Sequence, residues 1–169
     1  PDQDFDGGYH GTGNDNEWGQ RYADTLTRIM NADFNHIRES YDRAVVGEYA
    51  SAQRLTSSQE CTKFWVGLRS SFPSATFKIH HQIGLDADML SPRAAIRWSL
   101  DGKHDGWGTF GAPTGADVHV MGMCHAEFGP YGHDGVGLRR EFALYDEIAI
   151  WKQILMQSMS YPPNEYGLS

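Results

Sequence analysis

Residues 97–115 read RWSLDGKHDGWGTFGAPTG, and this stretch decides the fold that the sequence predicts. A strand-like run ends in a polar segment that is rich in glycine and holds His104 near its centre. The segment closes on Pro113-Thr114-Gly115, a turn sequence. So many glycines disfavour a helix and suit sharp bends in a curved sheet, where backbones approach closely. The stretch therefore indicates a β-rich region.

Alternating apolar and polar residues continue on both sides of this stretch, as in β-strands. We predict strands at 75–83, 93–100, 103–110, 116–128 and 136–145. The strand at 116–128 carries apolar residues on both faces, among them Met121 and Met123 on the second face. We therefore expect a pocket on one face and a second copy of the chain, in a homodimer, on the other.

Helical periodicity dominates the first part of the chain. We predict helices over 17–30 and 34–41, a third opened by the capping box Ser57-Ser58-Gln59-Glu60, and a last one over 146–159. Residues 42–50 are predicted as a short strand or an extended stretch. Helices followed by antiparallel strands indicate an α+β domain, with three main helices packed on one strongly curved sheet around a conical pocket.

Length and composition indicate one globular domain of 169 residues. We place the domain at 17–160, after an arm or linker at 1–16 and before a tail at 161–169. The net charge of −8 argues against nucleic acid or an anionic membrane as a partner. No apolar run approaches the roughly 20 residues of a membrane span, so we expect a cytoplasmic protein. Cys61 and Cys124 are expected to be buried free thiols.

The spacing of the eight histidines argues against a metal site. No HxH or HExxH pattern and no cluster of cysteine and histidine is present. His119 and His125 share one face of a strand but lie about 20 Å apart along it. We expect neither a metal nor an organic cofactor.

Residues 97–98, 102–106 and 110–115 resemble the signature region of the SnoaL-like polyketide cyclases, members of the nuclear transport factor 2-like superfamily. Residues 140–146 are similar to that family's last strand and its acidic residue. The resemblance covers roughly residues 17–159 and implies the cone fold of the superfamily. The chain departs from the family pattern with Lys103 for threonine, Ala112 for proline and Phe142 for tryptophan. Some relatives carry two such domains, so the chain could be one half of a tandem protein.

Asp146 is the first candidate for catalysis. It is in phase with Arg140 and Phe142, so these side chains should share one face of the last strand. A carboxyl group among apolar neighbours has a raised pKa and could take a proton from an activated C–H bond. Asp146 also stands where the last helix needs an N-cap, and both roles remain open.

His104 is the second candidate, because an imidazole on this segment could hydrogen-bond a substrate carbonyl or enolate oxygen. The alternative is a histidine whose bonds are satisfied by backbone or water. The substrate-binding residues that we predict around this pair are Trp98, Arg140, Phe142, His81 and Trp107. Arg140 could instead form a surface ion pair, and His81 could be a core residue beside Phe77 and Ile79.

Two functions from different classes follow. In the first, the protein is a cofactor-independent cyclase: Asp146 removes a proton flanked by carbonyls, the enolate attacks a second carbonyl, and His104 stabilises the oxyanion. Isomerase or epoxide hydrolase activity would use the same pocket. In the second, the cone is a non-catalytic module that binds a small apolar ligand or joins two chains. The first function requires Asp146 and His104 to converge in one pocket.

Overall fold

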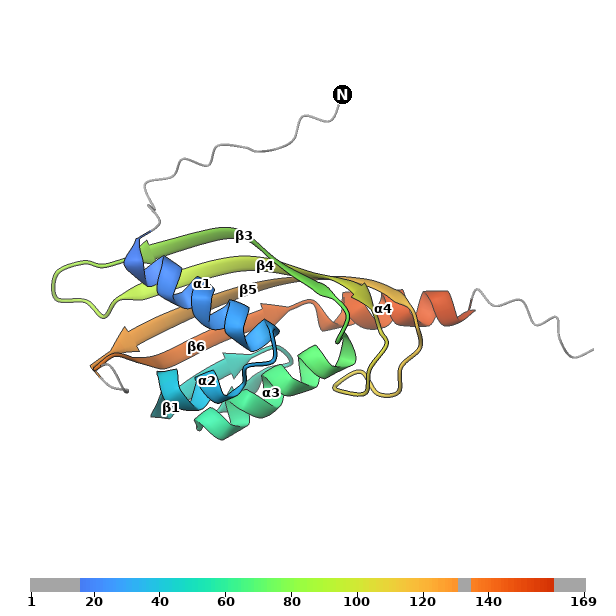
Figure 1. The fold of residues 1–169 in the computed structure, drawn as a ribbon, viewed down its shortest axis with the longest axis horizontal. Coiled ribbons are helices and arrows are strands. Elements are labelled where there is room, and N and C mark those ends of the chain that lie inside the picture. The colour runs from blue at the N-terminus through green and yellow to red at the C-terminus, as the bar shows by residue number, and fades with distance from the viewer. Residues whose placement is uncertain (1–15, 131–134, 160–169) are drawn as a thin grey trace, which may run out of the picture.

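The computed structural model describes residues 16–130 and 135–159, and Figure 1 shows how they are arranged. The predicted arm and tail lie, except for residue 16, outside the described residues. The described elements are α1 (Glu17–Met30), α2 (Asn35–Ser40), β1 (Tyr41–Tyr49), β2 (Gln53–Leu55), α3 (Ser58–Ser71), β3 (Thr76–Leu85), β4 (Arg93–Lys103), β5 (Asp117–Gly129), β6 (Gly137–Tyr145) and α4 (Glu147–Met159).

The strands form one curled, mixed sheet in the order β2-β1-β6-β5-β4-β3. Neighbours are antiparallel except β1 and β6, which run parallel. Helix α1 packs over β3 and β4, and α3 packs over β1 and against α2 (Figure 1). The predicted α+β cone is confirmed, and each of the four helices that the sequence predicted is among the described elements. No helix in the described ranges combines the length and hydropathy needed to cross a bilayer.

Local signals in the sequence explain where the first helices begin. Asn16 caps α1, since its Oδ1 accepts hydrogen bonds from the backbone N–H groups of Trp18 and Gly19. Ser57 caps α3 by accepting from Glu60 N–H, as the capping box predicts. In a capping box the glutamate side chain binds the backbone N–H of the cap residue itself. Here the Glu60 carboxylate accepts instead from Thr56 N–H, one residue before the cap.

The strand predicted at 103–110 is wrong, because β4 ends at Lys103 and a loop follows. The loop is held by His104, whose N–H donates to Ala116 O and whose C=O accepts from Gly115 N–H. A Cβ on Gly106 would lie 2.0 Å from Ser70 O, and one on Gly108 would lie 2.3 Å from Gly67 O. These two glycines therefore allow the loop to approach α3 closely.

Helix α4 takes the place of a strand along part of β5. The last residue of β6, Tyr145, pairs with Gly122, so the β5 edge before Gly122 has no β6 partner. The Gln153 amide accepts from His119 N–H at 2.8 Å and donates to His119 C=O at 3.0 Å. Gln157 makes the same pair of bonds to Asp117. Two side chains one helical turn apart thus satisfy backbone groups that an edge strand would leave open.

Met121 and Met123 share the exposed second face of β5, as predicted, but β3 changes phase in its middle. The β3–β4 register shifts between Ile79 and His81. His81 therefore pairs with the exposed Arg97, and both side chains are on the outer surface. The prediction that His81 lies on the inner face with Phe77 is wrong because this bulge reverses the alternation.

Candidate functional site

Asp146 lies at the start of α4 and is exposed. Its Oδ1 accepts a hydrogen bond from Ala149 N–H at 2.9 Å, which is the predicted N-cap. It lines a cavity of about 280 Å³ on the outer side of the sheet, together with Arg97, Met121 and Leu144. Arg140 and Phe142 share this outer face, where the Phe142 ring lies 5.8 Å from the His125 ring.

His104 lies inside the protein beneath the loop that follows β4. It is completely buried, its Nδ1 is 3.0 Å from Thr114 Oγ1, and its ring centroid is 5.7 Å from that of Phe72. Burial lowers the pKa of His104, which favours the neutral imidazole. The predicted convergence with Asp146 is not found, because the cavity that Asp146 lines is on the outer face and does not include His104. Catalytic roles for the two residues stay predictions.

The remaining predicted residues are divided between the interior and the surface. Trp98 is buried on the inner face, where its Nε1 donates to Cys124 Sγ at 3.1 Å. Trp107 is 73% exposed in the loop after β4, so it lines no inner pocket. Of the predicted substrate-binding residues, Trp98 alone is buried inside the described structure.

The interior holds a carboxyl group that the sequence did not single out. Glu141 is on the inner face of β6 and is completely buried. The hydroxyl of Tyr22 donates to Glu141 Oε2 at 2.6 Å, and that of Tyr41 lies 2.8 and 2.9 Å from the two carboxylate oxygens. The hydroxyl of Tyr49 donates to Oε1. We call these four residues the Glu141 cluster.

Burial controls the protonation of the cluster. It raises the pKa of Glu141, although the hydrogen bonds from the tyrosines act in the opposite direction. Burial and the nearby carboxylate raise the pKa of Tyr22, Tyr41 and Tyr49 well above the usual value. Glu141 therefore keeps its proton to higher pH than an exposed glutamate does.

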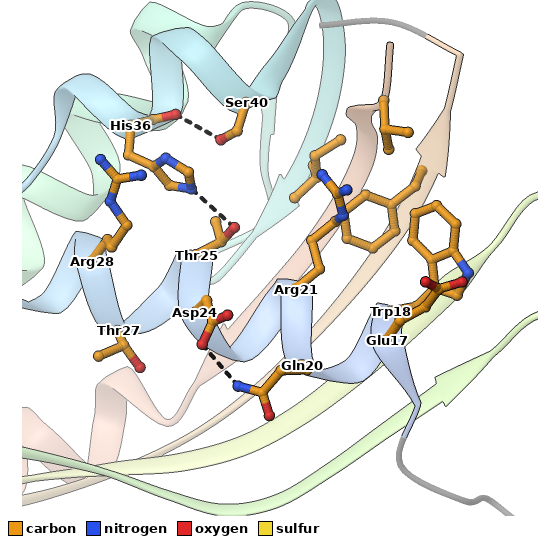
Figure 2. Close-up of a pocket in the computed structure, with 13 residues that line it drawn as sticks. Glu17, Trp18, Gln20, Arg21, Asp24, Thr25, Thr27, Arg28, His36 and Ser40 are labelled. Atoms are coloured by element: carbon orange, nitrogen blue, oxygen red, sulfur yellow. Dashed lines mark hydrogen bonds between the residues drawn. The ribbon is translucent and has the colours of Figure 1, made fainter. Parts of the chain in front are cut away.

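A groove of about 890 Å³ lies between α1 and α2 (Figure 2). Its floor is apolar and is formed by Trp18, Phe128, Val136 and Leu138. Its wall is polar: Thr25 Oγ1 is 3.1 Å from His36 Nε2, and Arg21 extends from α1 over the Trp18 ring. The rest of the wall is also polar and includes the charged side chains of Glu17, Asp24 and Arg28. A groove with an apolar floor and polar groups above it can hold a small molecule.

The groove and the Glu141 cluster are neighbours in the structure. Phe128 lines the groove and also makes an edge contact with the Tyr22 ring, at 6.3 Å between centroids. Leu138 lines the groove and pairs with Tyr41 in the β1–β6 ladder. The Tyr22 ring is therefore in direct contact with a side chain of the groove floor, and it links the groove to the Glu141 cluster.

A weak signal for this cluster was present in the sequence. Glu141 alternates with Ala143 and Tyr145, so it belongs to the face of the strand opposite Asp146. Both faces contain apolar residues, so hydrophobicity could not identify the inner one. The sequence near Glu141 does not show that its carboxyl group is buried, because the three hydroxyl groups that bind it come from residues 92 to 119 positions away.

Replacing Asp146 distinguishes its cap from a catalytic role. Because Asn caps a helix about as well as Asp, Asp146→Asn should leave the free energy of unfolding unchanged, and Asp146→Ala should lower it by about 1 kcal/mol. Urea titrations of the three proteins measure this. Equal stabilities for the wild type and Asp146→Ala would contradict the cap.

The raised pKa of Glu141 predicts a pH-dependent stability. Between the unfolded pKa, about 4.3, and the higher folded value, the folded state holds a proton that the unfolded chain has released. This contribution is therefore present below the unfolded pKa and is lost as pH rises through the folded pKa. Relative to Glu141→Gln, the wild type should lose stability with rising pH, by at most about 1.4 kcal/mol per pH unit. Urea titrations over this range test it, and parallel curves for the two proteins would refute it.

Solved structures with the same fold include SnoaL-like proteins. A candidate SnoaL-like polyketide cyclase from Jannaschia sp. CCS1 matches with a TM-score of 0.65 and 16% identity, over 83% of this chain and 96% of that one. A second, from Shewanella denitrificans OS-217, matches with a TM-score of 0.60 and 18% identity, over 85% and 99%. A candidate hydroxylase, AclR from Streptomyces galilaeus, matches with a TM-score of 0.61 and 15% identity, over 82% and 83%.

No protein-family model and no curated protein matches the sequence. The identities to the solved structures are low, so the matches show a shared fold and leave the chemistry of the site to be argued from its residues. The chain has the fold of these SnoaL-like polyketide cyclase structures, as the resemblance of residues 97–115 implied.

Proposed function

We propose that this protein binds a small apolar carbonyl compound in the groove between α1 and α2 and catalyses proton transfer on it without a cofactor. The observation that carries the proposal is the Glu141 cluster, a buried carboxyl group with three tyrosyl hydroxyls, which is linked to the groove floor by the contact between the Tyr22 and Phe128 rings. The SnoaL-like fold supports the reaction class, an intramolecular aldol-type cyclisation or an isomerisation of a polyketide-like substrate.

In the proposed reaction, ionised Glu141 accepts the proton of a C–H bond that lies between two carbonyl groups. Tyr22 is the hydroxyl next to the groove floor, and it relays the proton once the Phe128 ring has moved aside. The enolate carbon attacks a second carbonyl of the same molecule and forms a C–C bond. The new alkoxide then takes the proton back. Atoms balance with no other reactant, because the two carbonyls already make the C–H bond acidic.

A second candidate function is ligand binding without catalysis. Its favouring observation is that Glu141, Tyr22, Tyr41 and Tyr49 are each at most 2% exposed, so a ligand bound in the groove would not touch them. In that case the cluster is a polar part of the core, and the groove alone interacts with the ligand.

Deuterium exchange into a simple probe separates these functions. Ethyl 2-methylacetoacetate has one C–H between two carbonyls, and proton NMR in D2O follows its loss. The wild type should accelerate the exchange, and Glu141→Gln should reduce the acceleration on the order of a hundredfold, since an amide cannot accept the proton. Glu48→Gln is the matched control, because Glu48 is exposed on β1 and should exchange at the wild-type rate.

Each other outcome of this experiment has a defined meaning. No acceleration by the wild type, although the probe binds, would favour the binding module. Full activity in Glu141→Gln would exclude this carboxyl group as the base. Loss of activity in Asp146→Asn instead would support the residue that the sequence indicated.

We also propose that the outer face of the sheet joins two copies of the chain. Met121, Met123 and Leu144 are 48%, 63% and 57% exposed along neighbouring β5 and β6. Arg97 and Asp146 stand on opposite flanks of these residues, and opposite charges there favour pairing across a two-fold axis.

A charge placed on this surface tests the dimer. Met123→Asp would be buried without a partner in the interface, so it should convert a dimer at micromolar concentration to monomer in sedimentation velocity. Met89→Asp is the control, because Met89 is fully exposed in the loop between β3 and β4. A wild type that is already monomeric would refute the proposal.

A further inference from the structure

Trp18 lies between two cavities. On one side is the groove of about 890 Å³. On the other is a second cavity of about 430 Å³, beside the loop between β3 and β4. Trp18, Phe128 and Val136 line both of them. These three side chains therefore form a wall that the two cavities share.

Non-covalent contacts at the edge of the protein hold the Trp18 ring in this wall. Its centroid is 5.2 Å from that of Phe128, and the Arg21 guanidinium carbon lies 5.6 Å from the indole ring. Its Nε1 donates to Asp86 Oδ2 at 3.2 Å, just beyond the end of β3. The side chain is half-buried and this hydrogen bond is exposed, so water can replace it when the ring moves.

The two cavities differ in chemistry. The groove has polar and charged side chains along α1, among them Glu17, Arg21 and Asp24, and at the end formed by α2, where His36 and Thr25 are hydrogen-bonded (Figure 2). The second cavity is lined mainly by apolar side chains, including Met89, Leu90, Pro92 and Pro130. A molecule that reached from one to the other would place its polar end near His36 and its apolar end near Leu90.

We propose that Trp18 is a gate that sets how long an apolar chain this protein accepts. The ligand class is an elongated amphipathic molecule with a hydrogen-bonding head and an apolar tail. While the indole of Trp18 is hydrogen-bonded to Asp86, the tail of the ligand ends at the Trp18–Phe128 pair. With the indole displaced, the tail continues into the second cavity. This inference rests on the ligand-binding role proposed for the groove, but it does not depend on proton transfer.

Straight-chain alkanoates from hexanoate to tetradecanoate are suitable probes, with affinity measured by calorimetry. Affinity should rise about fourfold for each methylene that becomes buried, and should stop rising when the tail meets Trp18. In Trp18→Ala the rise should continue for two or more further methylenes. Trp18→Leu, a milder change for the fold, should extend the rise in the same direction, and Asp86→Ala should do so partly by releasing the indole.

Two controls test the path of the tail. Trp107→Ala removes an exposed tryptophan far from this wall in sequence and should leave the limiting chain length unchanged. Adding Leu90→Glu to Trp18→Ala places a charge in the second cavity and should abolish the gain. The proposal is overturned if folded Trp18→Ala and Trp18→Leu keep the wild-type limit, or if the gain survives Leu90→Glu.

The outcomes also separate this inference from the proposed function. Binding of short alkanoates with no effect of Trp18 would refute the gate and leave the groove as a binding site. A change of limiting length at Trp18 without any deuterium exchange would support the gate and refute the catalytic proposal. Failure of every alkanoate to bind any variant would overturn the gate, whereas the catalytic proposal would still be decided by the deuterium-exchange experiment.

Discussion

The structure depends on keeping one carboxyl group away from water. Burying Glu141 is costly unless its oxygens are hydrogen-bonded, and the bonds come from three hydroxyls on two other elements. Tyr22 is on α1, Tyr41 and Tyr49 are at the two ends of β1, and Glu141 is on β6. Because an unpaired partner would be left in the core, α1, β1 and β6 have to be positioned together. These hydrogen bonds span the parallel β1–β6 pair of an otherwise antiparallel sheet.

The orientation of β6 determines which residues are available to a ligand. With Glu141 facing inward, Arg140, Phe142 and Leu144 must face outward, and Asp146 follows on the same side. The carboxylate that resembles the family's acidic residue thus caps α4 on the outer surface. The Asp146 carboxylate adds a charge to the outer face beside the exposed methionines. The Glu141 carboxyl group is instead buried in the interior.

Local patterns allowed much of the fold to be predicted, and the remainder depends on long-range contacts. The bounds of α1 and the faces of β4 and β5 follow from periodicity and one capping residue. The glycines after β4 could indicate either strand bends or close approach to a helix, and only the position of α3 decides between them. The bulge that turns His81 outward has no marker in the sequence. The candidate site was missed for the same reason, since nothing local predicts that Tyr22 and Glu141 meet across 119 positions.

Protonation of Glu141 must rearrange its own hydrogen bonds. The ionised carboxylate can accept from all three tyrosyl hydroxyls. A protonated carboxyl group has to donate its own proton to one of those oxygens, and at least one hydroxyl then needs another acceptor. The thiols of Cys124 and Cys61 are buried near Tyr22 and Tyr49, respectively, and sulfur is a weak hydrogen-bond acceptor that can take that role. This role explains why two thiols that form no disulfide are buried beside the cluster. A tyrosyl hydroxyl that is displaced when Glu141 is protonated can therefore turn to a buried sulfur atom instead of being left without an acceptor.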